Sequence, residues 1–572
     1  MAPNPVDLLS SLLSARPADG VILEIDLDRG VLQSLPENPL QAVRAINSPT
    51  MGLLAGTLRK AALDDRVKGL VMHIGSCPLT PAQIDELGRS VAAFGEHKPT
   101  VAYAETFGEL SSGMFAYRLA TSAREIWLQP SGAVVLGGVH LEIALLRGGL
   151  EKLGIDPDFE QRYEYKTAGD QLAATEVTPA NREMMQRIAD SLVDETVRIV
   201  ADRRGLTGDE VRAVVDGGQL SAAEAKARRL VDHVGYRDEV YAAVRAQWGA
   251  DATLQYASRY AGTLAVRVAE QLTRRHLPTV AVVTVHGGIV TGRGGQTSPL
   301  QGRQAGSETV TEHLRAAMAD DDVVAVVLDV DSPGGSYVAS DTIRRAVLQL
   351  RQHGRPVVAS MGAVAASGGY FVSMGADEVV ALESTLTGSI GVVAGKLVNQ
   401  RLFDKLGIVR EGISAGANAD LNAGGHRWSD EQRAQVERWL DEVYDDFTQK
   451  AAADRHLPLA RVRELARGRV WTGADAHERG LVDHLGGREL AVQRAADLAG
   501  LARDRVQVRP FPALGLLERL RPAESSEAPG GLTGAWSGAT ELTPEGLLRA
   551  AAGAAGVTYL GALSVPFRLT IR

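Results

Sequence analysis

The chain has 572 residues, of which 45% are hydrophobic and 23% charged, a composition typical of a globular protein with more than one domain. Its formal net charge of −9 at pH 7 argues against nucleic acid as a main partner, because phosphate binding needs clustered lysine and arginine. The single cysteine, Cys77, excludes an internal disulfide and a cysteine-ligated zinc site, and we expect it to be a small buried residue. No motif predicts a metal or a cofactor, so we expect none.

Neither end of the chain predicts a transmembrane helix. Residues 6–15 are apolar, but the run is short, has no basic region before it and meets Arg16 and Pro17, so we expect no secretory signal. Residues 550–567 are rich in glycine and alanine and include polar residues and a proline, which favours a peripheral membrane contact or a packed tail. We therefore expect a protein that is cytoplasmic or peripherally associated with the cell membrane.

Strand-like apolar runs alternate with amphipathic, helix-like stretches along the chain. This alternation predicts a mostly parallel sheet with helical crossovers. The continuous apolar run of residues 323–328 indicates a strand buried on both faces. Two long helices are predicted, the first with Thr178 as N-cap and Pro179 at its first position. The predicted strands are residues 21–25, 69–74, 100–104, 280–285, 323–330 and 357–360, and the long helices are residues 179–203 and 429–454.

Three other segments differ in composition from these elements. Residues 292–306 are rich in glycine, serine and glutamine, which predicts a mobile loop. Residues 522–546 are rich in proline, glycine, serine and threonine, which predicts a linker or a disordered tail. Residues 511–520 could form a short amphipathic helix.

The second half of the chain repeats short stretches of the first half. LVDHVG at 230–235 returns as LVDHLG at 481–486, and KLGI at 152–155 returns at 405–408. Since the spacing between matching stretches drifts only slowly, we expect two copies of one fold with small loop insertions. The predicted organisation is an N-terminal tail (1–17), a first repeat (18–250), a linker (251–276), a second repeat (277–500) and a partly disordered C-terminal tail (501–572).

A serine followed by glycines stands out in the second repeat. Ser367 follows a predicted strand and precedes Gly368, and the stretch 331–336, which reads DSPGGS, follows the neighbouring strand and includes Gly335. Acyl transfer by a serine enzyme uses a nucleophilic serine and backbone N–H groups that donate hydrogen bonds to an oxyanion. We expect Gly368 and Gly335 to donate to the oxyanion. Taken singly, each stretch is equally typical of a structural turn or a helix start.

These motifs closely resemble the signal peptide peptidase A (protease IV) family in its long, tandem-duplicated form. The resemblance rests on residues 332–336, 361–370 and 384–391, extends to 470–473 and 480–483, and covers most of 18–500. It implies an α/β fold of two tandem domains like those of the Clp protease and crotonase superfamily, with repeated β-β-α units and helical extensions. It also implies a homotetramer that acts on cleaved signal peptides.

The resemblance further implies a Ser/Lys dyad in which the second repeat supplies the serine and the first repeat the lysine. The family lysine lies in a Tyr-Lys-Ser/Thr-Ala context, which this sequence matches with Lys166, although residues 169–171 replace the usual acidic-proline run. Burial would lower the pKa of this lysine and let it act as general base toward Ser367. Ser389 carries over as a hydroxyl that orients the lysine, and a purely structural hydroxyl is the alternative.

Neither repeat carries a whole site by itself. At the position of the glycine pair the first repeat reads SCPL at 76–79, and the second repeat has no lysine where the first has Lys166, so we expect one composite site per chain. His233 and His484 occupy equivalent positions in both repeats, which favours a structural role. His286 stays open as the base of a Ser-His-Asp triad.

Three functions compete at this point. The first is a serine endopeptidase that hydrolyses signal peptides or other short apolar peptides. The second is an acyl-CoA enzyme of the crotonase superfamily, which needs an oxyanion hole but no nucleophilic serine. The third is a non-catalytic scaffold that binds peptides, since a fold does not fix a function.

Overall fold

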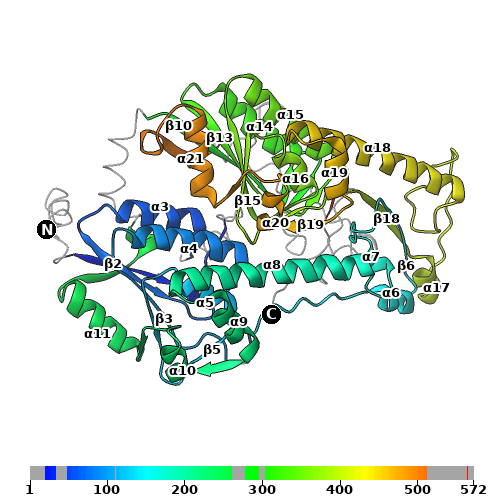
Figure 1. Ribbon diagram of the computed structural model, residues 1–572. Coiled ribbons are helices and arrows are strands. Elements are labelled where there is room, and N and C mark those ends of the chain that lie inside the picture. Colours follow the sequence, from blue (N-terminus) through cyan, green and yellow to red (C-terminus); the bar gives the residue numbers. More distant parts are fainter. Residues whose placement is uncertain are drawn as a thin grey trace, which may run out of the picture. The chain divides into compact units, whose positions relative to one another are not determined.

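The computed structural model describes residues 20–33, 48–109, 111–260, 277–294, 303–511 and 563–564 (Figure 1). The chain divides into two compact units. Unit 1 comprises residues 1–139, 193–275 and 572, and unit 2 comprises residues 140–192 and 276–571. Unit 2 is therefore built from two separate stretches of the chain.

Unit 1 contains a six-stranded sheet with the order β8-β4-β3-β2-β1-β9, and every neighbouring pair in it is parallel. Parallel strands need crossover connections, and helices supply them here. A separate antiparallel pair joins β5 (Ala133–Val135) to β7 (Gln219–Ser221). The strands of the main sheet are β1 (Val21–Asp26), β2 (Val67–His73), β3 (Thr100–Ala104), β4 (Glu125–Leu128), β8 (His233–Val234) and β9 (Thr253–Tyr256).

Both faces of this sheet are covered. Leu23 and Ile25 point to the face that packs against α3 and α4, whereas Ile22 points to the opposite face with Val240 and Val244 of α11. This division follows from the alternation of side chains along a strand. The helices of unit 1 are η1 (Leu27–Arg29), α3 (Met51–Ala61), α4 (Pro81–Gly95), α5 (Met114–Ala120), α9 (Gly208–Gly217), α10 (Ala222–Ala227), α11 (Arg237–Trp248) and α12 (Ala257–Tyr260).

Unit 2 contains an eight-stranded sheet whose main path is β19-β17-β15-β13-β10-β21, with β16 paired to β15 and β20 to β16. All its pairs are parallel except that of β17 with β19. Its strands are β10 (Thr279–His286), β13 (Val323–Ser332), β15 (Val357–Ala366), β16 (Glu378–Ala381), β17 (Leu386–Gly388), β19 (Val470–Thr472), β20 (His484–Leu485) and β21 (Gln507–Pro510).

Two smaller sheets accompany it. One has the order β12-β11-β14-β22, and the other pairs β6 with β18 in antiparallel fashion. These strands are β6 (Asp156–Gln161), β11 (Gly288–Val290), β12 (Gln304–Gly306), β14 (Gly334–Gly335), β18 (Val393–Val398) and β22 (Leu563–Ser564).

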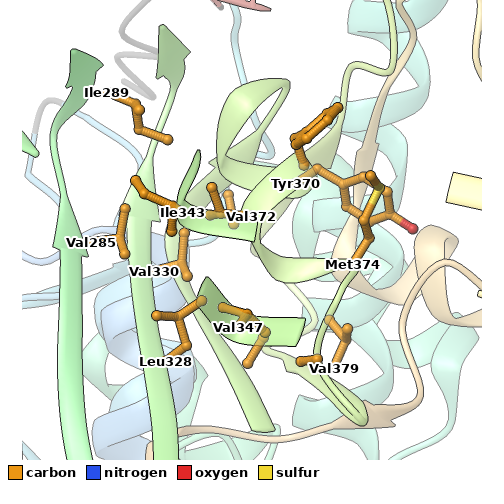
Figure 2. Packing of buried hydrophobic residues seen from close by; sticks show 14 of the residues in the cluster. Val285, Ile289, Leu328, Val330, Ile343, Val347, Tyr370, Val372, Met374 and Val379 are labelled. Carbon is orange, nitrogen blue, oxygen red and sulfur yellow. The ribbon is translucent and has the colours of Figure 1, made fainter. Parts of the chain in front are cut away.

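In unit 2, as in unit 1, both faces of the main sheet are covered by packed side chains. Val285, Leu328 and Val330 point to one face of the sheet, where they meet Ile343 and Val347 of α15 (Figure 2). Val280, Val282 and Val327 point to the other face and pack against α21. The helices of unit 2 are α6 (Arg147–Leu153), α7 (Asp170–Ala173), α14 (Ser307–Ala319), α15 (Tyr337–Gln352), α16 (Gly368–Ser373), α17 (Gln400–Lys405), α18 (Asp430–Asp454), α19 (Leu459–Leu465), α20 (Gly473–Glu478), α21 (Arg488–Leu498) and η2 (Arg503–Arg505).

One helix belongs to both units. Helix α8 (Pro179–Arg204) begins in unit 2 and ends in unit 1, since the division falls after residue 192. Its start is the predicted one, because the Thr178 hydroxyl accepts a hydrogen bond from the N–H of Asn181 at 3.2 Å.

The predicted strands and both long helices are confirmed, with ends displaced by up to six residues. Strands also form in three segments for which none was predicted: residues 253–256 of the expected linker form β9, residues 304–306 of the expected loop form β12, and residues 507–510 of the expected tail form β21. Each is short and gains its order from pairing with a neighbouring strand, which local composition does not encode. The predictions for residues 1–17, 522–546 and most of 511–520 and 550–567 fall outside the described residues.

Two further expectations can be compared with the structure. Among the described residues, no helix is both long and apolar enough to cross a membrane. Cys77 has a free thiol and is half-buried against the core of unit 1, so it is less enclosed than expected.

Candidate active site

Ser367 lies at the sharp turn between strand β15 and helix α16. It is fully buried, and its φ of 56° and ψ of −113° are unusual for a residue that has a side chain. Its N–H donates to the carbonyl of Gly388 at 2.8 Å, which ties the turn to the end of β17. Strained backbone of this kind persists only where surrounding contacts hold it, and it is common at active sites.

Lys166 lies in the segment between β6 and α7, inside unit 2. Its side chain is 1% exposed, and its Nζ donates to the Oγ of Ser367 at 2.8 Å. Burial lowers the pKa of the Lys166 amine to about 7, because the charged form loses its hydration. The amine can therefore be neutral near physiological pH and accept a proton from the serine.

Ser389 completes the surroundings of the amine. The Lys166 Nζ contacts the Ser389 Oγ at 3.0 Å and the Ser389 carbonyl oxygen at 3.2 Å. Like Ser367, Ser389 has a positive φ, of 51°, and it follows the end of β17. The structure thus brings together the three side chains that the sequence singled out.

The glycines expected to donate to an oxyanion also lie next to each other. A Cβ atom placed on Gly368 would lie 3.0 Å from the Gly334 Cα and 3.1 Å from the Gly335 nitrogen, so the two turns pack backbone against backbone. Gly335 has a φ of 153°, and its β14 segment pairs with Ile289 on one side. On the other side Gly335 pairs in antiparallel fashion with Leu563 of β22.

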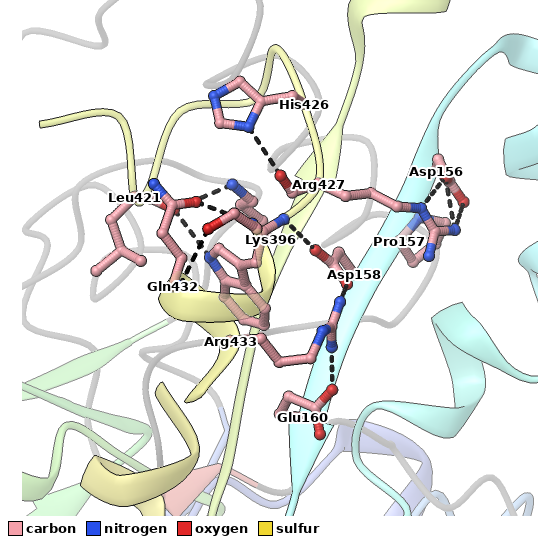
Figure 3. Close-up of polar contacts among 12 residues, drawn as sticks. Asp156, Pro157, Asp158, Glu160, Lys396, Leu421, His426, Arg427, Gln432 and Arg433 are labelled. Carbon is pink, nitrogen blue, oxygen red and sulfur yellow. Dashed lines mark hydrogen bonds and ion pairs between the residues drawn. The ribbon is translucent and has the colours of Figure 1, made fainter. Parts of the chain in front are cut away.

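A polar network anchors the strand that leads to Lys166. In β6, Asp158 is 3% exposed and accepts from the Arg433 guanidinium at 2.6 Å and from the N–H of Trp428 at 2.8 Å (Figure 3). Arg427 binds Asp156 of the same strand at 2.6 Å, and Arg433 also contacts Glu160. The whole of β6 pairs with β18, so the approach to Lys166 is fixed by residues of the second repeat.

The histidines considered as bases have other partners. His286 Nε2 lies 3.2 Å from the Asp329 carboxylate, and β13 separates the strand of His286 from β15, the strand that precedes Ser367. His233 and His484 begin the outer strands β8 and β20 in the two units and lie 3.4 Å and 3.2 Å from Glu125 and Glu378 respectively. Equivalent contacts in both units agree with a structural role for this pair.

Comparison with known proteins identifies the family. A model of the peptidase family S49 matches residues 92–251 and 349–502. The chain belongs to peptidase family S49. The two matched regions show that it carries two S49 domains in tandem, and both units have the mixed α/β architecture expected from the sequence.

Individual relatives agree with this family. Serine protease SPPA, chloroplastic, from Arabidopsis thaliana is 31% identical over 473 residues, which are 82% of this chain and 67% of that protein. Protease 4 from Haemophilus influenzae is 31% identical over 465 residues, which are 78% of this chain and 72% of that protein. Among solved structures, a ClpP1 mutant from Listeria monocytogenes matches with a TM-score of 0.23 and 14% identity, covering 37% of this chain and 94% of that chain. The family match and the two relatives named as proteases show that this chain is a serine peptidase.

The sequence did not indicate every residue that surrounds the candidate site. The segment Arg467–Arg469 contacts the backbone next to both Lys166 and Ser389, but the family resemblance began only at Val470. Gly468 has a φ of +82°, and a positive φ cannot be recognised from a single glycine in a sequence. The one sequence signal for this segment was its position directly before Val470, where a stretch that resembles the family begins.

Proposed function

We propose that this S49 chain hydrolyses peptide bonds with a Ser/Lys dyad made of Ser367 and Lys166. The observation that carries the proposal is the 2.8 Å contact between the Lys166 Nζ and the Ser367 Oγ, in a buried setting that lowers the pKa of the amine to about 7. A nucleophile within hydrogen-bond reach of a base, which is itself oriented by a third group, is the pattern of covalent catalysis. Ser389 is that third group.

The steps follow from these positions. Neutral Lys166 takes the proton from Ser367 as the serine oxygen attacks the peptide carbonyl carbon. The protonated amine then donates to the leaving nitrogen, the C–N bond breaks and an acyl-enzyme remains on Ser367. A water molecule gives its proton to Lys166 and attacks the acyl carbonyl, and the return of that proton to the serine oxygen releases the acid product.

Gly368 and Gly335 are the proposed oxyanion donors. Their backbones lie against each other beside Ser367, with 3.1 Å between the Gly335 nitrogen and a Cβ placed on Gly368. Backbone N–H groups held in this way stabilise the negative charge that develops on the carbonyl oxygen, and a loss of one such donor costs about 10²–10³ in kcat.

The proposed substrates are cleaved signal peptides or other short apolar peptides in extended conformation. The edge of β14 accepts an antiparallel strand, since Leu563–Ser564 pairs with Gly334–Gly335 there, and a peptide on that edge would lie beside Ser367. A relative from Enterococcus faecium that carries the name signal peptide peptidase SppA is 33% identical over 198 residues, which are 35% of this chain and 58% of that protein. Tetramer formation and membrane contact stay predictions.

Labelling with a fluorophosphonate serine probe tests the proposal. We expect the full-length chain to be labelled and Ser367→Ala to be unlabelled, because the probe reacts with an activated serine. Lys166→Ala should lose labelling and peptide hydrolysis together. Hydrolysis that persists in both variants would exclude the dyad and indicate another nucleophile.

A further inference from the structure

Three residues that precede strand β19 contact the backbone of Ser389 and the segment that carries Lys166. We propose that Arg467, Gly468 and Arg469 form a positioning clamp that holds Lys166 against Ser367 and Ser389. The inference rests on the proposed dyad, and it adds residues that touch neither the substrate nor the reacting atoms.

The backbone of the clamp is hydrogen-bonded on both sides of the site. The carbonyl of Arg467 accepts from the N–H of Tyr165 at 3.2 Å, next to Lys166. The carbonyl of Arg469 accepts from the N–H of Ser389 at 2.7 Å. Two carbonyls of one three-residue segment therefore fix the segments that carry the base and its orienting hydroxyl.

Gly468 between them leaves room for the backbone of Lys166. A Cβ atom at position 468 would lie 2.4 Å from the Lys166 nitrogen and 2.5 Å from its Cα and its Cβ. Contacts below 3.0 Å with backbone atoms cannot be relieved by rotating a side chain, so any larger residue must move Lys166 or the clamp. The N–H of Gly468 also donates to the carbonyl of Ile390 at 2.8 Å, one residue after Ser389.

A second glycine extends the same close packing along the lysine side chain. A Cβ on Gly391 would lie 2.7 Å from the Gly468 Cα and 3.3 Å from the Lys166 Cδ. The aliphatic stem of Lys166 is thus enclosed by backbone of these two glycines. This enclosure excludes water from the amine, and exclusion of water is the cause of its lowered pKa.

The two arginine side chains hold the residues that precede Lys166. Arg467 forms an ion pair with Glu164 at 2.6 Å. Arg469 lies over the ring of Tyr165 at 4.8 Å and pairs with Glu183 at 2.9 Å, while the Tyr165 hydroxyl donates to the same Glu183 at 2.5 Å. The backbone and the side chains of the clamp therefore contact the same short segment of the chain, which ends at Lys166.

Substitution of Gly468 by alanine in the full-length chain is the direct test, with Gly354→Ala as the matched control. Both glycines have a positive φ, +82° for Gly468 and +72° for Gly354, so alanine strains the backbone similarly at both, but nothing lies within 4 Å of a Cβ at Gly354. The substrate is an internally quenched apolar peptide, and kcat, KM and the pH dependence of kcat are measured. We expect Gly468→Ala to lower kcat by about 10²-fold with little change in KM, because a 1 Å misplacement costs about that much. Its apparent pKa should also rise, since water reaches the amine.

Because Gly468→Ala could also impair folding, Arg469→Met provides a second test with its own control. Arg469 and Arg479 lie over the Trp471 ring at 4.5 Å and 4.3 Å, but only Arg469 also lies over Tyr165, so Arg479→Met removes a similar stacking contact away from Lys166. We expect Arg469→Met to lower kcat by about tenfold and to raise the apparent pKa, while Arg479→Met keeps both near the wild-type values.

The possible results distinguish a failure of the clamp proposal from a failure of the dyad proposal. If Gly468→Ala and Arg469→Met fold and keep the wild-type kcat and apparent pKa, while Ser367→Ala is inactive, the clamp is wrong and the dyad stands. If Ser367→Ala hydrolyses the peptide as fast as wild type, the dyad itself fails, whatever the clamp variants do.

Discussion

The Lys166 Nζ lies 2.8 Å from the Ser367 Oγ, although 201 positions separate the two residues in the sequence. The lysine belongs to the first sequence repeat, yet it lies in compact unit 2 together with the serine. Strand β6 explains the difference, because it pairs with β18 of the second repeat and carries the chain toward Lys166. The candidate dyad is therefore built inside one compact unit.

The rate of peptide hydrolysis should rise with pH through about 7. Only neutral Lys166 can accept the serine proton, and burial lowers the pKa of its amine to about 7. We expect kcat/KM to increase about tenfold per pH unit below that value and to level off above it. A profile measured between pH 5 and 9 on wild type and His286→Ala checks this. A loss of the inflection in His286→Ala would assign the titration to the histidine instead.

Lys166→Met should abolish hydrolysis and stabilise the fold near neutral pH. The pKa of the lysine amine is lower in the folded than in the unfolded chain, so the unfolded chain binds more protons between about pH 7 and 10.4. Stability of the wild type therefore rises with pH across that window, and methionine removes this dependence. At pH 7 we expect the free energy of unfolding to increase by about 1 kcal/mol or more, measured by denaturant unfolding. A marked destabilisation would contradict a neutral, buried amine.

Ser389→Ala should lower kcat by about tenfold without preventing folding. The Ser389 hydroxyl contacts the Lys166 Nζ at 3.0 Å, and its loss leaves the amine with the Ser389 carbonyl and Ser367. Ser373→Ala is the matched control, because Ser373 is equally buried but its hydroxyl donates to the Gly369 carbonyl at 2.8 Å. Equal kinetics of both variants would make Ser389 a structural hydroxyl.

Leu563→Pro should lower the KM for peptide substrates. The Leu563–Ser564 strand pairs with Gly334–Gly335 on the edge proposed for substrate, and proline both removes a backbone donor and restricts the backbone. Steady-state kinetics of the full-length chain measure the change. If KM stays the same in Leu563→Pro, β22 does not compete with the peptide.

Much of the fold could be predicted from the sequence, because buried parallel strands leave strong local signals. The apolar run in β13 and the N-cap of α8 at Thr178 are examples, and both are confirmed. The strands β9, β12 and β21 were missed, since three or four residues carry too little periodicity and gain their order from a neighbour.

The residues of the candidate site likewise divide into those that could be predicted from the sequence and those that could not. Ser367 and Gly335 were found because they follow predicted strands, whereas Lys166 and Ser389 were found through the resemblance to the family. That residues 140–192 belong to compact unit 2 could not be predicted, because two copies of one fold give the same local pattern in either arrangement. The pairing of β6 with β18 and the contacts of Gly468 join residues far apart in the chain, and no local pattern in the sequence links them.

The discontinuous build of unit 2 has a consequence for the chain during its synthesis. Residues 140–192 leave the ribosome long before residues 276–511, with which they form unit 2. At about 5–20 residues per second, the 201 positions between amine and hydroxyl correspond to about 10–40 s of translation. During that interval a nascent chain holds the amine and no partner serine, so the proposed dyad cannot form until the second half of the chain is made.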